Sequence, residues 1–230
     1  MSTILITGSN RGIGLELVKQ YADDNWRVYA CCRSPETAIE LNKLAEKYGD
    51  ISIHALDVAD SRQINELASE LRDIPLDILF NNAGIYGPYD AVFGNTDEQQ
   101  WLECFKINTI SPMKVTEAFV NNVANSELKI IATMSSKMGS MADNGSGGSY
   151  LYRSSKAAVN AVMTSAAIDL KPKGIKVGIM HPGWVKTDMG GPNGEITTSQ
   201  CVQQLKKILS ELTLEKSGSF FEIDGSVIPW

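Results

Sequence analysis

Short apolar runs alternate along this chain with longer segments of helical periodicity, and this alternation constrains its fold more than any other feature. The apolar runs are rich in β-branched residues and have the length of strands, whereas the segments between them repeat apolar residues at helical spacing. Strands are predicted at 3–7, 28–32, 51–56, 77–80, 128–134, 175–180 and 220–223. Helices are predicted up to about residue 24 and at 35–48, 60–72, 97–123, 152–170 and 197–212. Such an alternation builds right-handed crossovers and therefore predicts a parallel sheet with helices on both faces.

The composition fits one globular unit and excludes several classes of protein. With 230 residues and a hydrophobic fraction of 43%, the chain can bury a core without disulfides, and it is not disordered, collagenous or a coiled coil as a whole. A net charge of −6 argues against a nucleic-acid surface, and no segment indicates a membrane span or a signal peptide. Reduced, packed thiols rather than zinc ligands are expected at Cys31, Cys32, Cys104 and Cys201. We therefore expect one cytoplasmic domain over residues 1–230, with no metal site and no membrane or nucleic-acid partner.

A glycine loop separates the first predicted strand from the first helix. Residues 7–14 read Thr-Gly-Ser-Asn-Arg-Gly-Ile-Gly, with glycines spaced GxxxGxG, which is not the spacing of a nucleoside-triphosphate loop. Glycines let backbone N–H groups approach a phosphate, and a helix N-terminus adds positive potential. An ordinary turn is the alternative, but the position after the first strand favours a dinucleotide site. Its predicted residues are Gly8, Ser9, Asn10, Arg11, Gly12, Ile13 and Gly14.

The end of the second predicted strand indicates which dinucleotide is bound. An acidic residue that binds the ribose is expected there, but the stretch ends in Cys32 and Arg33 with no Asp or Glu. Arginine pairs bidentately with a phosphate, and Arg11 in the glycine loop adds a second cation. NADP(H) is therefore predicted in preference to NAD(H), with two solvated surface arginines as the alternative.

Seven motifs, in order and at family spacing, resemble the short-chain dehydrogenase/reductase family over about residues 3–230. They are Thr7 to Gly14, Asp57-Val58, Asn81 to Gly84, Asn108, Ser135-Ser136, Tyr152 to Lys156, and His181 to Thr187. Further stretches at 150–156, 182–191 and 219–230 are similar to the C-factor/sniffer-like branch of carbonyl reductases. We predict a single-domain doubly wound Rossmann fold whose seven-stranded parallel sheet has the order 3-2-1-4-5-6-7.

The resemblance also assigns a catalytic set. Tyr152 and Lys156 are four residues apart in a helical pattern and face the same way, and a nearby ammonium is expected to lower the phenol's pKa. The family roles are proton donor for Tyr152, and tuning of Tyr152 and binding of the nicotinamide ribose for Lys156. Ser136 would hydrogen-bond the substrate oxygen, with Ser135 as its rival. Tyr150 is the rival of Tyr152, although no lysine follows it four residues on.

The resemblance places Asn108 at a local break in the helix predicted at 97–123, where its exposed carbonyl would bind a water that relays protons to Lys156. Thr96 is expected to cap this helix, and Pro112 cannot donate a hydrogen bond to the carbonyl of residue 108. An asparagine that simply faces solvent is the alternative.

The remaining cofactor contacts also follow from the resemblance. Asp57 and Val58 would touch the adenine, although Asp57 could instead cap the helix that starts near Asp60. Passing under the cofactor would be Asn82, Ala83 and Gly84. The nicotinamide carboxamide would be held by Pro182, Gly183, Val185 and Thr187. His181 and His54 are expected to be structural.

These features together predict an NADPH-dependent carbonyl reductase acting on a small ketone or aldehyde. The alternatives are a C-factor-like signalling protein that binds or senses a dinucleotide, and an NAD-dependent alcohol dehydrogenase. The segment 188–200 is short for a lid, so an open apolar pocket is expected, lined by Met138, Tyr86, Trp184 and Met189. The resemblance further implies a homo-dimer or tetramer formed through the helices predicted at 97–123 and 152–170.

Overall fold

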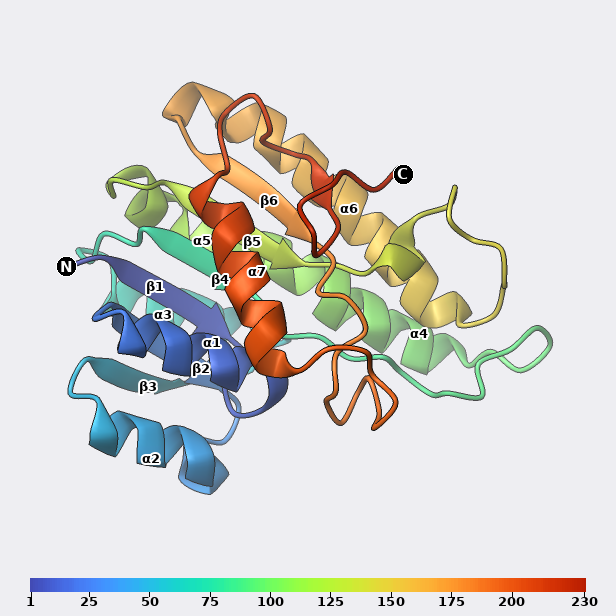
Figure 1. The fold of residues 1–230 in the computed structure, drawn as a ribbon, viewed down its shortest axis with the longest axis horizontal. Helices are drawn as coiled ribbons and strands as arrows, with labels where there is room; N and C mark the ends of the chain where they lie inside the picture. The colour runs from blue at the N-terminus through green and yellow to red at the C-terminus, as the bar shows by residue number, and fades with distance from the viewer.

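The computed structural model describes residues 1–230 as one α/β domain built on a seven-stranded sheet (Figure 1). All neighbouring strands are parallel, and their order is β3-β2-β1-β4-β5-β6-β7. The strands are β1 Thr3–Thr7, β2 Arg27–Cys32, β3 Ile51–Ala55, β4 Ile78–Asn81, β5 Ile130–Met134, β6 Lys176–Met180 and β7 Phe220–Phe221. The predicted fold class and strand order are confirmed.

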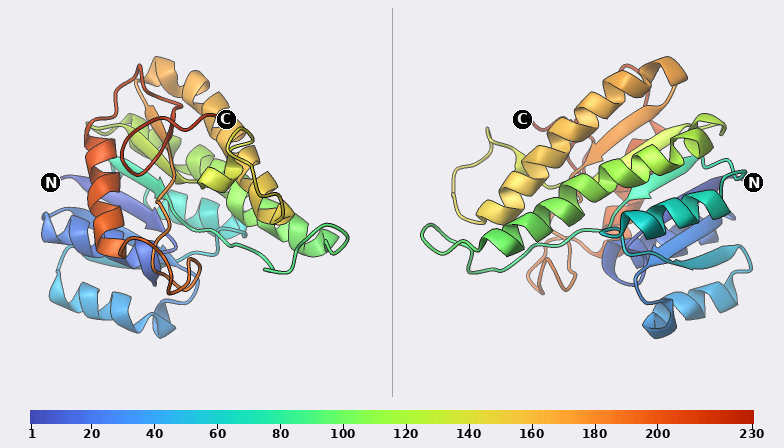
Figure 2. Two further views of the ribbon diagram at one scale, coloured as in Figure 1. Left: turned by 45° about the vertical axis from the view of Figure 1, so that its right-hand side comes forward. Right: turned by 180° about the vertical axis from the view of Figure 1, so that it is seen from behind.

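Helices cover both faces of the sheet. They are α1 Gly12–Asp23, α2 Ile39–Lys47, α3 Ser61–Glu70, α4 Glu98–Phe105, α5 Ser111–Ala124, α6 Tyr150–Leu170 and α7 Thr198–Ser210. The helices α1, α2 and α7 lie on one face, and α3, α5 and α6 lie on the other (Figures 1 and 2). The helix α4 continues the line of α5 beyond the sheet and packs beside α6 (Figure 2). None of the helices combines the length and the apolar character that a bilayer span requires.

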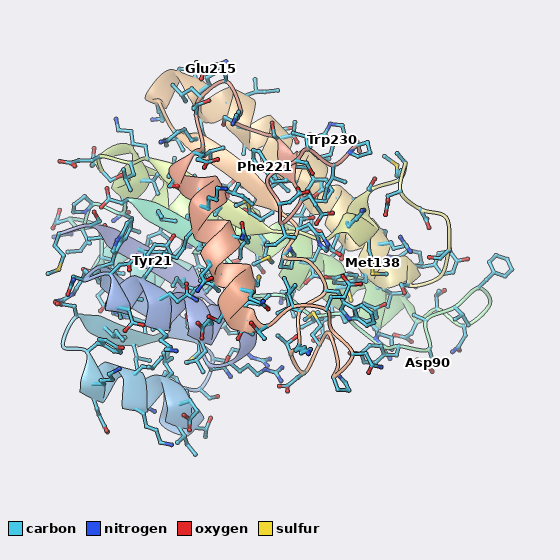
Figure 3. All side chains as sticks on the ribbon, viewed as in Figure 1. Tyr21, Asp90, Met138, Glu215, Phe221 and Trp230 are labelled. Atoms are coloured by element: carbon cyan, nitrogen blue, oxygen red, sulfur yellow. The ribbon has the colours of Figure 1, made fainter.

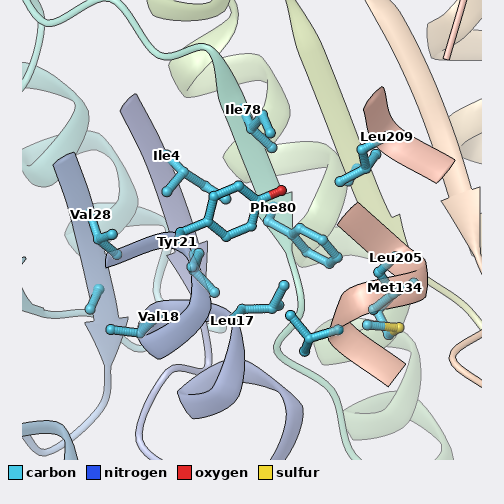
Figure 4. Close-up of a cluster of buried hydrophobic side chains, with 14 of the residues drawn as sticks. Ile4, Leu17, Val18, Tyr21, Val28, Ile78, Phe80, Met134, Leu205 and Leu209 are labelled. Carbon is cyan, nitrogen blue, oxygen red and sulfur yellow. The ribbon is translucent and has the colours of Figure 1, made fainter. Parts of the chain in front are cut away.

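Two hydrophobic clusters, one on each face, hold these layers together. On the α1 and α7 face, side chains such as Leu17, Phe80 and Leu205 pack together and are fully buried (Figure 4). On the other face, Phe119 and Met163 pack from α5 and α6 onto the sheet. Strands that are buried on both faces need continuous apolar runs, which explains why such runs are visible in the sequence.

The predicted long helix at 97–123 is interrupted. Its N-cap is Asp97, whose carboxylate accepts the N–H of Gln100 at 2.8 Å, so the expectation of a cap at Thr96 is wrong. The chain is α-helical to Phe105, forms a π-helical turn at Lys106–Ile110, and resumes as α5 at Ser111. Pro112 has no N–H for the carbonyl four residues earlier, which agrees with a wider turn at this point.

Other boundaries shift because of backbone conformation. The fifth strand begins at Ile130 rather than 128, since Lys129 has a φ of 54° and cannot be in a strand. The predicted 35–48 helix is a 3₁₀ turn at Pro35–Thr37 followed by α2. The helix predicted from 152 starts at Tyr150, directly after Ser149 in the left-handed region.

Candidate active site

The loops that follow β1, β4, β5 and β6 leave the sheet at its carboxyl edge, where the sequence motifs are concentrated (Figure 1). Asp90 in the β4 loop and Met138 in the β5 loop mark two of these segments on the same side of the molecule (Figure 3). Ligands of doubly wound sheets bind at this edge.

Hydrogen bonds from the β4 loop hold the glycine loop in place. The Thr7 hydroxyl accepts the N–H groups of Asn82 and Ala83, each at 3.1 Å. The side-chain amide of Asn82 donates to the carbonyls of Thr7 at 2.9 Å and Gly8 at 3.1 Å. Gly8 and Gly12 have φ of 70° and 57°, the left-handed region that favours glycine. The loop therefore has a fixed shape where it enters α1.

Two further glycines permit close approaches. A methyl group on Gly14 would lie 2.1 Å from the carbonyl oxygen of Gly8, so only glycine lets α1 start this close to the loop. A methyl on Gly84 would lie 3.2 Å from Oδ1 of Asn108 and 3.6 Å from Nζ of Lys156. Gly84 therefore borders the predicted catalytic set directly.

The other residues of the glycine loop differ in what they can offer a ligand. The Ser9 side chain is buried, and its hydroxyl donates to the carbonyl of Ile6 at 2.8 Å. Ile13 packs against the core on the α1 face. Asn10 and Arg11 are exposed. Their side chains are available to a ligand, whereas those of Ser9 and Ile13 are occupied.

The two arginines predicted to bind a 2′-phosphate are both exposed. Nη1 of Arg11 pairs at 2.6 Å with Oδ2 of Asp188, in the loop after β6. Arg33 follows β2 directly and forms no ion pair. The Arg33 side chain is thus free in solvent. Arg11 is held only by an exposed ion pair, which contributes little to stability and breaks readily.

A cavity of about 540 Å³ adjoins the glycine loop on the outer side of α1. Arg11, Gly12 and Thr187 contribute to its wall together with charged side chains of α1 and α2. Neither Tyr152 nor Lys156 lines it, so it lies beside the loop rather than over the candidate catalytic groups.

Asp57 and Val58 follow β3 at the same edge. The Asp57 carboxylate accepts the N–H of Ala59 at 2.9 Å within its own turn. The cap of α3 is Asp60, which accepts from Arg62 and Gln63, so the alternative that Asp57 caps this helix is wrong.

Tyr152 and Lys156 share the buried face of α6. Nζ of Lys156 donates to the carbonyl oxygen of Met134 at 2.8 Å, at the end of β5, and lies 5.7 Å from the centre of the Tyr152 ring. Burial lowers the pKa of Lys156 to about 8. Burial also raises the pKa of Tyr152 to about 12, and a hydrogen bond with Ser136 opposes it only partly. The expectation that Lys156 lowers the tyrosine's pKa is not met, since desolvation dominates.

The two neighbouring serines have different partners. The Ser135 hydroxyl donates to Oδ1 of Asn160 at 2.5 Å in the interior. The Ser136 oxygen accepts the N–H of Met138 at 3.2 Å, and this hydroxyl is the one near enough to Tyr152 to oppose the rise of its pKa. Ser136 therefore keeps a proton to donate beside the tyrosine, whereas Ser135 is used within the core.

The segment between Ser136 and Tyr152 first approaches α6 closely, at Gly139, and then leaves it. The chain runs from Ser136 through a 3₁₀ turn, Lys137–Gly139, into the loop 140–149. A methyl on Gly139 would lie 2.8 Å from the backbone of Lys156. The absence of a side chain at Gly139 thus lets the segment after Ser136 pack against α6. Residues 140–149 form the loop that follows. Tyr150, the rival of Tyr152, packs instead against the small cluster of Ala91, Cys104 and Leu151.

Asn108 is buried in the π-helical turn, so the alternative that it faces solvent is wrong. Its Oδ1 accepts the N–H of Ile85 at 2.9 Å, and its Nδ2 donates to the Ile85 carbonyl at 2.8 Å and to the Ser155 hydroxyl at 3.0 Å. The side chain therefore joins the β4 loop to α6. Only its backbone carbonyl is left for a relay of the kind that the resemblance implies.

The loop after β6 folds back onto the glycine loop. Gly183 has a φ of 78°, and Val185 is buried and pairs with Ile196. A methyl on Gly12 would lie 3.5 Å from Cγ2 of Thr187, so the two loops touch. Pro182 is half-buried at the start of this loop. The four residues predicted to clamp the nicotinamide thus follow one short path at the carboxyl edge.

The segment 188–200 does not form a closed lid. Trp184 and Met189 expose 50% and 41% of their surface, and Tyr86 and Met138 are half-buried. All four side chains therefore keep surface exposed to solvent, and the apolar pocket that they would line stays a prediction.

Each of the two histidines lies beside a carboxylate. Nε2 of His181 lies 3.6 Å from Oε1 of Glu222, and Nδ1 of His54 lies 3.5 Å from Oε1 of Glu70. Burial lowers the pKa of both imidazoles against the attraction of these carboxylates.

Two neighbours of the candidate pair were not predicted to touch it. The Tyr86 ring stacks on the Tyr152 ring with centroids 4.6 Å apart. The Cys104 thiol is buried close enough to the pair to influence the pKa values of Tyr152 and Lys156. Of the two, only Cys104 could have been placed near the catalytic set from the sequence, because it lies four residues before Asn108 in a helical segment.

Comparison with known proteins identifies the family. The family model for short chain dehydrogenases matches residues 2–196. The chain is 40% identical over 156 residues to the C-signal protein of Myxococcus xanthus, covering 68% of this chain and 93% of that protein. It is similar in structure to the carbonyl reductase Sniffer of D. melanogaster, with 35% identity, a TM-score of 0.93 and full coverage of both chains. It is also similar to an NADPH-bound carbonyl reductase from chicken fatty liver, with 33% identity, a TM-score of 0.93 and coverage of 100% and 99%.

The fold and these matches define an oxidoreductase of the Rossmann type. The chain belongs to the short-chain dehydrogenase/reductase family and is related to the C-factor/sniffer-like branch, as its motifs indicated.

The buried ammonium of Lys156 generates a prediction about stability. Between about pH 8, its folded pKa, and its ordinary value of 10.5, the unfolded chain binds a proton that the folded protein has lost, so folding becomes more favourable as pH rises. Below that window the native state bears the full cost of the buried charge. Lys156→Met is therefore expected to be more stable than the wild type at about pH 7, by on the order of 1–3 kcal/mol, and to lose this advantage toward about pH 10.

Urea unfolding of both proteins at the two pH values measures this difference. Lys173→Met, at an exposed lysine, is the matched control and should show no such trend. An advantage of Lys156→Met that stays constant with pH would contradict the assignment of a buried charge.

Proposed function

We propose that this protein is an NADPH-dependent carbonyl reductase that transfers hydride to a ketone or aldehyde, with Tyr152 as the proton donor. The observation that carries the proposal is the buried set at the carboxyl edge, in which Ser136 contacts Tyr152 and Lys156 lies on the same face of α6. The similarity to two carbonyl reductases supports it.

In this proposal the polar groups divide the tasks of the reaction. Tyr152, whose burial keeps it protonated at neutral pH, donates its proton to the carbonyl oxygen. Ser136 donates a hydrogen bond to the same oxygen as charge develops on it. Lys156 holds the nicotinamide ribose and supplies positive charge beside the phenol. Asn108 holds the β4 loop against α6, and its carbonyl would bind the water that returns a proton to Lys156.

The residues at the edge of the sheet fit a dinucleotide. The left-handed Gly8 and Gly12 place backbone N–H groups at the N-terminus of α1, a site suited to a pyrophosphate. Asp57 and Val58 would contact the adenine. Residues 82–84 would pass under the cofactor, and the clamp residues of the β6 loop would hold the nicotinamide. When bound, NADPH supplies the hydride. The similar carbonyl reductase from chicken fatty liver was solved with NADPH bound, which supports NADPH as the cofactor in this proposal.

The catalytic assignment predicts that Tyr152→Phe loses about 10²–10⁴-fold in kcat, because the general acid is removed. NADPH binding should persist, since the glycine loop is unchanged. The measurement is NADPH consumption over a panel of quinones, diketones and aldehydes, with binding followed by NADPH fluorescence. A wild-type protein that binds NADPH and reduces no member of a broad panel would contradict the proposal. Such a result would favour a C-signal-like sensing role.

The cofactor preference depends on Arg11 and Arg33, which would pair with the 2′-phosphate. Replacing either by alanine should weaken NADPH binding by about 10–100-fold, the effect of losing a charge-assisted hydrogen bond, and leave NADH binding nearly unchanged. Calorimetric titration gives both Kd values. Arg72→Ala, an exposed arginine paired with Asp73 beyond α3, is the control. Tighter binding of NADH than of NADPH by the wild type would instead favour the NAD-dependent alternative.

We also propose that the protein is a cytoplasmic homo-dimer or tetramer that pairs through α4, α5 and α6. Leu102, Ile110 and Ile168 expose 55%, 52% and 70% of their surface on or beside these helices, and such a contact would cover them. Sedimentation equilibrium should give two or four times the chain mass, and Ile168→Glu should shift it toward the monomer. A wild-type monomer at micromolar concentration would refute this arrangement.

A further inference from the structure

We propose that Tyr86 is a positioning residue for Tyr152, and that its ring and hydroxyl together fix the direction in which the catalytic phenol points. This inference depends on the proposed function for its kinetic consequence but not for its structural one. No motif assigned Tyr86 a role beyond lining a pocket.

One side chain contacts both the catalytic residue and the start of the helix that carries it. The Tyr86 ring stacks on Tyr152 with centroids 4.6 Å apart and planes at 30°. The Tyr86 hydroxyl shares a hydrogen bond of 2.8 Å with the hydroxyl of Ser149, the residue immediately before α6. Ser149 itself adopts a left-handed conformation, with a φ of 47°. Tyr86 therefore contacts the N-terminal end of α6 at two points, namely Ser149 just before the helix and Tyr152 in its first turn.

The backbone next to Tyr86 is held from the other side by Asn108. Both the N–H and the carbonyl of Ile85 are bonded to the Asn108 side chain, at 2.9 Å and 2.8 Å. The same amide also donates to Ser155, on α6. Two separate ties therefore join the β4 loop to the helix of Tyr152. The Tyr86 side chain makes one of these connections, and Asn108 makes the other.

A third ring covers the outer face of this pair. Tyr89 stacks on Tyr86 at 4.8 Å and 22°, and its hydroxyl donates to the carbonyl of Met189 at 3.1 Å. Tyr89 is 72% exposed, whereas Tyr152 is 8% exposed, so the three rings form a stack from solvent to the buried phenol. This stack also connects the β4 loop with the β6 loop across the edge of the site.

Orientation matters here because proton transfer requires the phenol oxygen within hydrogen-bond reach of the substrate oxygen, and small misplacements cost rate. The titratable groups that face Tyr152 are Lys156 on the same helix, Cys104 on α4 and Tyr86 itself. Removing the Tyr86 ring would free the Tyr152 ring on one face. It would also admit water, which stabilises the phenolate and lowers the pKa that burial now raises.

The test compares Tyr86→Leu, which removes the ring, with Tyr86→Phe, which keeps it. Tyr86→Leu should lower kcat for carbonyl reduction about two- to tenfold, the factor that corresponds to an aromatic pair of roughly 0.5–1.4 kcal/mol. The KM for NADPH should stay unchanged. The decline of kcat at high pH should begin at lower pH, because the acid form is lost earlier. Tyr86→Phe, which keeps the ring and loses only the hydrogen bond to Ser149, should fall between Tyr86→Leu and the wild type in both properties.

The matched control is Tyr150→Leu, the same substitution two residues before Tyr152, at a side chain that packs on Ala91, Cys104 and Leu151 and not on the Tyr152 ring. It should leave the pH profile in place. A Tyr86→Leu protein with wild-type kcat and pH profile would overturn the inference, and so would a Tyr150→Leu protein with the same shift.

A second measurement is independent of turnover. In protein labelled with ¹³Cζ-tyrosine, the Tyr152 resonance, assigned by its loss in Tyr152→Phe, should titrate at lower pH in Tyr86→Leu than in the wild type. If the wild type reduces no carbonyl compound but this shift is observed, the proposed function fails and the positioning role stands. If the Tyr152 titration is unchanged, the positioning role fails whatever the activity.

Discussion

All seven strands of the sheet run in the same direction, so every loop that follows a strand leaves from one edge. This constraint brings together residues as far apart in sequence as the glycine loop at 8–14, Asn82, Ser136 and Thr187. A reversed central strand would send its loop to the opposite edge and remove its residues from the site. The common direction of the strands therefore gives the polar motifs one location. Apolar burial on both faces of the sheet holds the strands in this arrangement.

Within that edge, buried polar groups fix the loops relative to one another. Asn82 joins the glycine loop to the end of β4, and Asn108 joins the β4 loop to α6. Lys156 bonds to the last carbonyl of β5. Each of these side chains is expensive to bury unless it is paired, so their partners specify one arrangement of the loops. The same burial raises the pKa of Tyr152 and lowers that of Lys156, which leaves the phenol protonated at neutral pH.

The sequence predicted the elements well where periodicity determined them and less well where single contacts did. The parallel sheet and the approximate helices followed from apolar runs and helical periodicity, and the strand order followed from the family resemblance. The cap at Asp97 and the shortened fifth strand depended on local backbone geometry. The break at Asn108, which the resemblance implied, is present as the π-helical turn before Ser111. For the site, spacing placed Tyr152 beside Lys156, but it could not reveal that desolvation outweighs the ammonium in setting the phenol's pKa. Nor could it show that Tyr86 stacks on Tyr152, because that contact joins a loop to a helix across 66 positions of sequence.

We propose that the glycine loop, the two arginines and the Tyr152 set form one site for NADPH. A crystal structure of the complex with NADPH would test this arrangement. We expect the pyrophosphate at the N-terminus of α1, the 2′-phosphate against Arg11 and Arg33, and the nicotinamide ribose within hydrogen-bond distance of Lys156. A dinucleotide bound with its nicotinamide away from Tyr152, or with its 2′-phosphate touching neither arginine, would contradict it.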